Sequence, residues 1–271
     1  MSTIATAPAP VTTQPILLHA ASDGIATLTL NRPQQYNALS FAMLDALLAA
    51  LGQIEHDPSV RVVVIAGNGT AFCAGHDLKE MRADTSKAFY DRLFARCSEF
   101  MLTLARLPQP VIARVHGIAT AAGCQLVAAC DLAVVSDNAR FATSGINIGL
   151  FCSTPAVALT RNVSRKRAME MLMTGDFIDA ATARDFGLVN RVVPLAELDA
   201  EVSRLAASIK SKSPVAVATG KRLFYPQLEA GVEDAYRLAA EAMACNMVAG
   251  DAQDGVAAFV DKRPMPPWQG R

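Results

Sequence analysis

The stretch VIARVHGIATAAGCQLVAACD, residues 111–131, contains the change of periodicity that decides the fold. VIARV is a β-branched run typical of a buried strand, whereas residues 122–129 are small or apolar and favour a helix. A helix leaves its first backbone N–H groups without partners inside the helix. The stretch therefore predicts a strand-to-helix turn whose N–H groups can hold an anion.

A second stretch has the same sequence pattern. AFCAGHDLKEM, residues 71–81, follows the β-branched run RVVVIA and again places small residues where a strand gives way to a helix. Two such turns can surround an oxygen atom on which negative charge develops during a reaction. The pair indicates oxyanion chemistry before any side chain is considered.

The first 194 residues alternate between strands and helices. Strand patterns occur at residues 25–30, 61–66, 111–115, 132–135, 140–142 and 189–193. Helical patterns occur from the cap Ser40 to residue 54, and at 86–107, 122–129, 155–162, 165–173 and 180–186. Strands separated by helices indicate an α/β fold with largely parallel sheets.

The pattern changes at residue 195, after which only helices are expected, near 195–212, 214–228, 232–248 and 252–262. Their wide Ala, Leu and Met faces favour burial against the core or against a neighbouring subunit. We therefore divide the chain into a disordered N-terminus (1–13), a core (14–194) and a helical C-terminal region (195–271).

Composition is that of a globular protein. Of 271 residues, 52% are hydrophobic and 18% charged, with 25 basic and 25 acidic side chains. The zero net charge predicts no affinity for nucleic acid or for an anionic membrane surface. The Ala/Thr/Pro-rich residues 1–13 resemble neither a secretory signal nor a transit peptide, and no apolar run is long enough to span a membrane. The expected location is the cytoplasm.

The cysteines show no C-x-x-C pair and no His/Cys spacing typical of a zinc site, so no metal is expected. Reduced and mostly buried thiols are the simpler interpretation. The six residues are Cys73, Cys97, Cys124, Cys130, Cys152 and Cys245.

Five motifs, in this order along the chain, resemble the crotonase, or enoyl-CoA hydratase/isomerase, superfamily. They are LNRPQQYNAL (30–39), AFCAGHDLKEM, HGIATAAGCQLVAACD, MLMTGDFIDAATARDFGLVNRVVP (171–194) and AAFVDKR (257–263). The resemblance implies a spiral of strand–strand–helix turns and a helical C-terminal region that packs around a homotrimer, commonly doubled to a hexamer. It also implies an acyl-CoA thioester as the ligand, with coenzyme A part of the substrate and no separate cofactor.

The resemblance assigns roles to individual positions. The backbone N–H groups of His76 and Ala122 match the two donors that hold the thioester oxygen. The expected coenzyme A contacts are the turn Asn37, Ala38 and Leu39, the residues Ala74 and Asp77, the phosphate-binding Lys79, and the C-terminal pair Phe259 and Lys262.

The sequence departs from the family where acid–base groups belong. A hydratase of this family uses two glutamates, and their positions hold Gln125 and Gly145 here. Gln125 can orient a water but cannot accept a proton near neutral pH, so two-carboxylate hydration is not supported. The case for isomerisation by the second glutamate alone is weakened equally, because Gly145 has no side chain. Other relatives place an aspartate further on, where this chain has Cys152 and Ser153.

Several of these side chains have a second, purely structural interpretation. Cys152 is either a thiolate near a helix N-terminus or a small buried filler. Ser153 and Thr154 are expected to cap a helix ahead of Pro155. The His76 side chain either titrates beside the donor or is an exposed residue that caps the loop.

Three other polar residues are expected to be structural. Asp77 should cap the helix that starts at Leu78, Asp131 should be structural, and His116 should end a core strand.

Three hypotheses for function follow. The first is an acyl-CoA enzyme that stabilises an enolate or tetrahedral oxyanion. The second is a non-catalytic acyl-CoA binder or assembly partner, for which Gln125→Glu with Gly145→Glu would restore hydration. The third is a thioesterase or other crotonase chemistry that uses Cys152 or Ser153.

Overall fold

The computed structural model describes residues 14–271, so the expectation for residues 1–13 lies outside the described chain. Two sheets form the body. The six-stranded sheet has the order β1-β2-β3-β5-β7-β10, with the bounds Leu17–Ser22, Ile25–Leu30, Val62–Gly67, Val111–Val115, Leu132–Ser136 and Arg191–Val193. Only its β1–β2 pair is antiparallel.

The second sheet has four short strands in the order β4-β6-β8-β9: Ala71–Cys73, Ile118–Thr120, Arg140–Ala142 and Ile178–Asp179. β4, β6 and β8 are parallel, and β9 pairs antiparallel with β8. The predicted α/β class with largely parallel sheets is confirmed. The strands β1, β4, β6 and β9 were not expected, because three have two or three residues and β1 presents mostly exposed side chains at a sheet edge.

The main core lies on one face of the six-stranded sheet. All six residues of β3 are buried, and Val63 and Ile65 point into a cluster with α1 (Phe41–Glu55), α3 (Lys87–Arg106) and α4 (Ala122–Ala129). Val62 and Val64 pack on the other face against α8 (Leu198–Lys210). A strand that is buried on both faces has a continuous apolar sequence, and VVVIA therefore predicts a strand clearly.

Two of the helix starts that the sequence predicted are present. Ser40 caps α1 by accepting the Met43 N–H at 3.3 Å, and Ser86 caps α3 by accepting the Phe89 N–H at 3.2 Å. The short helices are α2 (Leu78–Ala83), α5 (Ser153–Leu159), α6 (Arg165–Thr174) and α7 (Ala180–Phe186), with 3-10 turns η1 (Pro33–Gln35), η2 (Ser144–Ile148) and η3 (Leu195–Glu197).

The expected caps of α5 are wrong. The helix begins at Ser153 itself, Cys152 occupies the cap position without a side-chain bond, and Ser153 and Thr154 are its first two residues. Pro155 has a fixed φ and needs no N–H donor in the first turn, so the helix can start before it.

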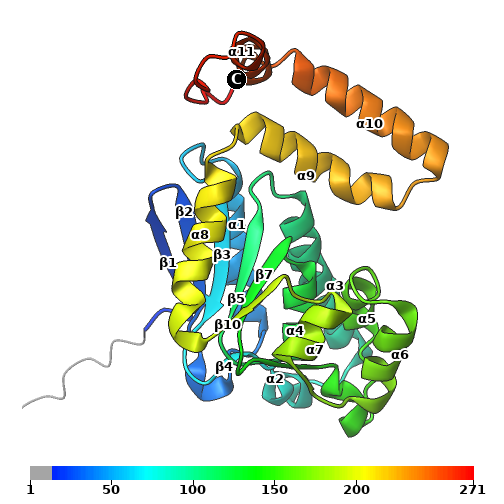
Figure 1. Cartoon of the computed structure of the whole chain (residues 1–271). Coiled ribbons are helices and arrows are strands. Elements are labelled where there is room, and N and C mark those ends of the chain that lie inside the picture. The colour runs from blue at the N-terminus through cyan, green and yellow to red at the C-terminus, as the bar shows by residue number, and fades with distance from the viewer. Residues whose placement is uncertain (1–13) are drawn as a thin grey trace, which may run out of the picture.

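The C-terminal helices α9 (Pro214–Leu228), α10 (Val232–Met247) and α11 (Gly250–Val260) follow α8. Figure 1 shows α9 and α10 as an arm at one end of the body, with α11 beyond them. By contrast, α8 lies on the sheet. The division at residue 194/195 stays a prediction. No helix within residues 14–271 has the length and apolar character needed to cross a membrane.

Candidate functional site

The two glycine-containing turns lie in contact. Their strands β4 and β6 are parallel neighbours with Cys73 opposite Ala119, so both chains leave the small sheet at the same edge. Gly75 has φ +97°, and a Cβ placed on it would lie 3.2 Å from the Ala122 nitrogen. Only glycine adopts this backbone readily and leaves room for the neighbouring turn.

Free N–H groups occur at this junction. Within residues 14–271, neither the His76 N–H nor the Ala122 N–H donates a hydrogen bond. Ala121, the N-cap of α4, has φ 51° and ψ −121°, a conformation that costs an alanine free energy. Strain of this kind persists where the surrounding structure imposes it, often at functional sites.

Gly123 lets α4 approach the small sheet. A Cβ at this position would lie 2.0 Å from the Cys73 carbonyl oxygen, far inside van der Waals contact. The close approach fixes the N-terminus of α4 beside β4, and therefore beside the first turn.

Asp77 is a structural residue, as predicted. Its carboxylate accepts the N–H groups of Lys79 and Glu80 at the start of α2 and forms an ion pair of 3.0 Å with Arg32. Burial raises the pKa of Asp77, but these bonds outweigh it and hold the pKa below its usual value. The Asp77 carboxylate therefore fixes the start of α2, directly after His76.

The His76 side chain is half-buried, so the interpretation as an exposed loop cap is wrong. Its Nδ1 lies 3.3 Å from the Leu39 carbonyl oxygen, and its ring packs edge-on against Phe94 of α3 at a centroid distance of 5.5 Å. Burial lowers the pKa of His76, and the bond to Leu39 opposes that shift. Its Nε2 is buried without a partner among the described residues.

Gln125 lies one turn into α4, and its side chain is also buried. It is 4% exposed, and its Oε1 has no hydrogen-bond partner within residues 14–271. A buried amide oxygen without a donor is costly, and a bound ligand or water would remove that cost.

Comparison with known proteins shows the family of the chain. Residues 20–271 match the profile of the enoyl-CoA hydratase/isomerase family. The chain belongs to the enoyl-CoA hydratase/isomerase family. It is 46% identical over 254 residues to enoyl-CoA hydratase domain-containing protein 3, mitochondrial, from Xenopus laevis, which covers 94% of this chain and 86% of the relative.

Two crystal structures are also similar to this family member. An enoyl-CoA hydratase of Mycobacterium smegmatis is 59% identical with a TM-score of 0.92, covering 94% of this chain and 99% of that one. The human enoyl-CoA hydratase domain-containing protein 3 is 44% identical with a TM-score of 0.90, covering 93% and 100%. The crotonase fold expected from the motifs is confirmed.

The expected cytoplasmic location is contradicted. Relatives from Xenopus laevis, Rattus norvegicus, Mus musculus and Homo sapiens, 46–47% identical to this chain, are named mitochondrial proteins. Amino-acid composition is a poor guide to location, because location depends on sorting signals rather than on the composition of the folded domain.

The family's second glutamate position is filled by backbone. Gly145 lies in η2, and a Cβ on it would lie 2.5 Å from the Leu150 carbonyl oxygen and 2.9 Å from the Cys152 Sγ. The position therefore has no space for a larger side chain unless the 145–152 loop moves. The structure therefore has no empty space at residue 145 that a glutamate side chain could fill.

The residues considered as replacements lack the features of an activated nucleophile. Burial raises the pKa of the Cys152 thiol, and a hydrogen bond with the Gly145 backbone only partly offsets it. The Ser153 hydroxyl is exposed and lies 3.4 Å from the Phe151 carbonyl oxygen, and no base among residues 14–271 is bonded to it. An activated nucleophile needs a neighbouring base or a lowered pKa.

The residues expected at the pantetheine turn are close to His76. Leu39 forms an isolated parallel bridge with His76, and its N–H donates to the Gly75 carbonyl at 2.8 Å. Ala38 is buried, and the Ala74 N–H donates to the Tyr36 carbonyl.

The Asn37 side chain is wholly used in holding this turn. It is fully buried, accepts the Arg32 N–H, and donates to the Asn68 and Ala71 carbonyls at 2.8 Å. Any contact of Asn37 with a ligand would have to be made by its backbone.

The expected phosphate and adenosine contacts are separated within one chain. Lys79 is exposed on α2, whereas Phe259 and Lys262 are exposed at the end of α11. Figure 1 shows α11 at the end of the molecule opposite α2. The chain therefore does not bring these residues together by itself.

Sequence reasoning missed Arg32 and Phe94. Arg32 lies in the LNRPQQYNAL motif, but nothing in the sequence shows that its guanidinium pairs with Asp77 across the turn. Phe94 is one of several apolar residues on α3, and its contact with His76 depends on how that helix packs.

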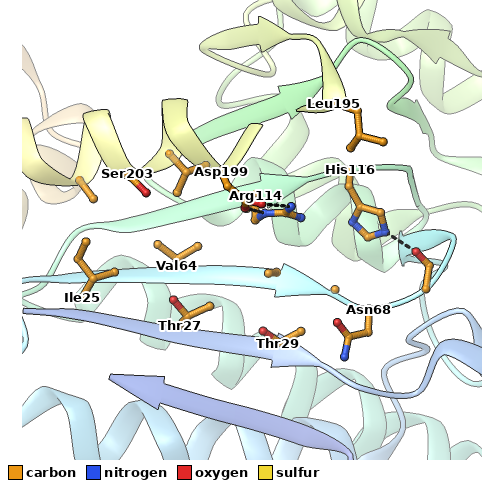
Figure 2. Close-up of a pocket in the computed structure, with 15 residues that line it drawn as sticks. Ile25, Thr27, Thr29, Val64, Asn68, Arg114, His116, Leu195, Asp199 and Ser203 are labelled. Carbon is orange, nitrogen blue, oxygen red and sulfur yellow. Dashed lines mark hydrogen bonds and ion pairs between the residues drawn. The ribbon is translucent and has the colours of Figure 1, made fainter. Parts of the chain in front are cut away.

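A separate hollow lies on the other face of the six-stranded sheet. It has a volume of about 500 Å³ and lies between α8 and the outer face of β2, β3 and β5. Figure 2 shows Arg114 paired with Asp199, and His116 bonded to a backbone oxygen. Because the two glycine-containing turns belong to the core on the other face, this groove is separate from the candidate site.

Proposed function

We propose that the chain binds an acyl-CoA thioester and stabilises negative charge on its carbonyl oxygen with the N–H groups of His76 and Ala122. The observation that carries this proposal is the contact between the two turns, each with an N–H free of partners within residues 14–271. Two preorganised donors each lower the free energy of an oxyanion transition state by about 3 kcal/mol.

Coenzyme A would lie along the turn of Asn37 to Leu39 and past Ala74, with Lys79 near a phosphate. The exposed position of Lys79 supports this assignment, because within residues 14–271 it forms no ion pair and its charge is available. Asp77 would support the site by holding α2 rather than by touching the ligand.

The proposed reaction is not two-carboxylate hydration. Gln125 offers an amide, and Gly145 offers no side chain at all. The orphaned Oε1 of Gln125 supports a role in orienting a ligand or water, since an amide oxygen accepts a hydrogen bond but does not take up a proton near neutral pH.

Binding and turnover together test the proposal. Calorimetry with butyryl-CoA should give a saturable isotherm, and substituting Lys79→Ala should weaken it. Turnover is then measured with crotonyl-CoA, a 3-enoyl-CoA and a saturated acyl-CoA against a buffer control. The absence of acyl-CoA binding would contradict the proposed function.

A non-catalytic acyl-CoA binder is the second candidate, favoured by the loss of both glutamates. It predicts the same binding isotherm with no product from any of the three thioesters. Hydration of crotonyl-CoA by the native chain would exclude this candidate. The thioesterase alternative is not proposed, because neither Cys152 nor Ser153 is activated.

We also propose a homotrimer or hexamer built on the C-terminal arm. None of the residues of α10 is buried, and Val232, Tyr236 and Met243 on one side of it are at least 71% exposed. Apolar faces of this kind mark protein–protein interfaces. A neighbouring copy could then supply Phe259 and Lys262 to the adenosine end of the ligand.

Light scattering tests this assembly. The native chain should have three or six times the protomer mass, and Tyr236→Glu with Met243→Glu should shift it to the monomer. A native chain that is monomeric at micromolar concentration would contradict the proposal.

A further inference from the structure

The His76 imidazole is held in one orientation with one nitrogen free. Its Nδ1 faces the Leu39 carbonyl oxygen at 3.3 Å, and a carbonyl can only accept a hydrogen bond. Nδ1 therefore carries the proton, and Nε2 presents a lone pair. That nitrogen is buried and has no partner within residues 14–271. A buried acceptor without a donor calls for an explanation, and a ligand is one.

The ring lies next to the proposed oxyanion position. The His76 N–H is one of the two proposed donors, so the imidazole is attached to the Cα beside that donor. The ring extends toward Phe94 of α3, between the oxyanion turn and the helix that covers it. A thioester whose oxygen is held by the His76 N–H would therefore lie beside the residue that carries this imidazole.

Several other titratable groups on the surrounding elements already have partners. Asp77 is paired with Arg32, Glu80 accepts the Phe41 N–H, and the Tyr90 hydroxyl donates to the Met81 carbonyl. Between α1 and α3, Arg96 bridges Asp45 and Glu99. The exposed titratable residues of α2 and of the start of α3 are Lys79, Arg82, Lys87, Asp91 and Arg92, and Asp84 between the two helices is partly exposed.

The nearby thiols are unsuited to accept a proton. Burial raises the pKa of Cys73 and of Cys124 to about 12, and it raises the pKa of Cys152 as well. With an amide at Gln125 and no side chain at Gly145, the imidazole is the one neutral base in this part of the described chain.

We propose that His76 Nε2 is the proton acceptor of this site and that it carries a proton from C2 to C4 of a 3-enoyl-CoA. The inference rests on the proposed binding of acyl-CoA. In the first step the C2–H bond breaks, Nε2 takes the proton, and the electron pair forms a dienolate whose oxygen is held by the two N–H groups. In the second step the imidazolium returns the proton to C4, the C2=C3 bond forms and the carbonyl is restored.

The reaction balances without water and without any other co-reactant, which suits a site that has Gln125 and Gly145 where a hydratase has its two glutamates. Burial, which lowers the pKa of His76, keeps the ring neutral near pH 7 and Nε2 available. A positioned general base contributes about 10²- to 10⁴-fold to a rate.

Substitution of the side chain tests the base separately from the donor, because His76→Ala keeps the backbone N–H. We expect the native chain to isomerise a short 3-enoyl-CoA. The substitution His76→Ala should lower the kcat of this reaction by about 10²-fold. Butyryl-CoA should bind both with the same Kd. Added imidazole should restore part of the lost rate, and His56→Ala, an exposed histidine at the end of α1, should behave as native.

The pH profile is a second readout. The native kcat/KM should fall on the acid side as His76 becomes protonated, and this limb should be absent from His76→Ala. If native chain binds butyryl-CoA but does not isomerise, or if His76→Ala isomerises at the native rate, the base role is overturned while acyl-CoA binding stands. If butyryl-CoA does not bind, the proposed function itself fails.

Discussion

The Lys221 ammonium on α9 lies 2.5 Å from the Asp131 carboxylate at the end of α4, and both groups are shielded from solvent. Lys221 also donates to the Leu104 and Gln109 carbonyls at 2.8 and 2.9 Å. Tyr225, one turn further along α9, donates to the other oxygen of Asp131 at 2.6 Å. This cluster fixes the base of the C-terminal arm on the core and confirms Asp131 as structural.

Removing the ammonium should destabilise the chain. Lys221→Met leaves Asp131 charged and partly desolvated, and the loss of one partner of a buried pair costs about 3 kcal/mol or more. The midpoint of urea unfolding measures the change. Arg222→Met on the exposed side of the same helix is the control and should leave the midpoint unchanged. Equal midpoints for the two variants would show that the cluster does not stabilise the arm.

A methyl group at Gly123 should disrupt the site. Its Cβ would meet the Cys73 carbonyl oxygen at 2.0 Å, and overpacking of a well-packed site typically costs about 1–3 kcal/mol and occasionally more. Gly220→Ala is the control, because no atom lies within 4 Å of that Cβ and alanine in a helix is favoured over glycine by about 1 kcal/mol. Thermal melts should move in opposite directions. A Gly123→Ala protein as stable as the native one would contradict the close approach.

Restoring glutamates should not restore hydration. Any Cβ at residue 145 meets the Leu150 carbonyl, so Gly145→Ala should lower the free energy of unfolding by about 1–3 kcal/mol. Gly52→Ala, with open space around it, is the matched control. Gln125→Glu with Gly145→Glu should be less stable still and should not hydrate crotonyl-CoA. A stable, active double variant would show that the loop rearranges freely.

Asp251 should hold the last residues of the chain. It is buried, accepts the Ser213 hydroxyl at 2.6 Å and the N–H groups of Gln269 and Gly270, and lies near the single tryptophan, Trp268. Asp251→Asn should expose Trp268 and shift its fluorescence to longer wavelength, with a loss of about 1–3 kcal/mol. The exposed Asp254→Asn is the control. An unshifted spectrum for Asp251→Asn would refute the anchoring role.

Stability should fall in mildly acidic solution because of two histidines. Burial lowers the pKa of His76 and of His116 from 6.5 in the folded chain, so the unfolded chain takes up protons first as the pH falls. The free energy of unfolding is then highest above pH 6.5 and decreases below it, by at most about 1.4 kcal/mol per pH unit for each proton. Between pH 6.5 and 5 the variant His76→Gln with His116→Gln should lose less stability than the native chain. If the native chain and the variant lose the same free energy of unfolding over this pH range, the two histidines are not the cause.

Local periodicity was enough to predict most of the elements. Ser40 before an apolar helical pattern predicted α1, and VVVIA predicted β3, because these signals depend on the residues themselves. The strands β4 and β6 could not be recognised, since three residues carry no period and their pairing joins segments 47 residues apart. Gly145 could be placed by register, but the backbone that fills its side-chain space is contributed by Leu150.

By itself, the sequence determined the α/β class, the family and the two turns with free N–H groups, because strand and helix periods and glycine turns are local properties. The tertiary structure decided that AFCAGHDLKEM and HGIATAAGCQLVAACD meet, through the parallel pairing of β4 with β6 and the missing side chain of Gly123. It also decided that the Asp77 carboxylate has an ion-pair partner whereas His76 Nε2 has no hydrogen-bond partner within residues 14–271, because such partners come from residues distant in the chain.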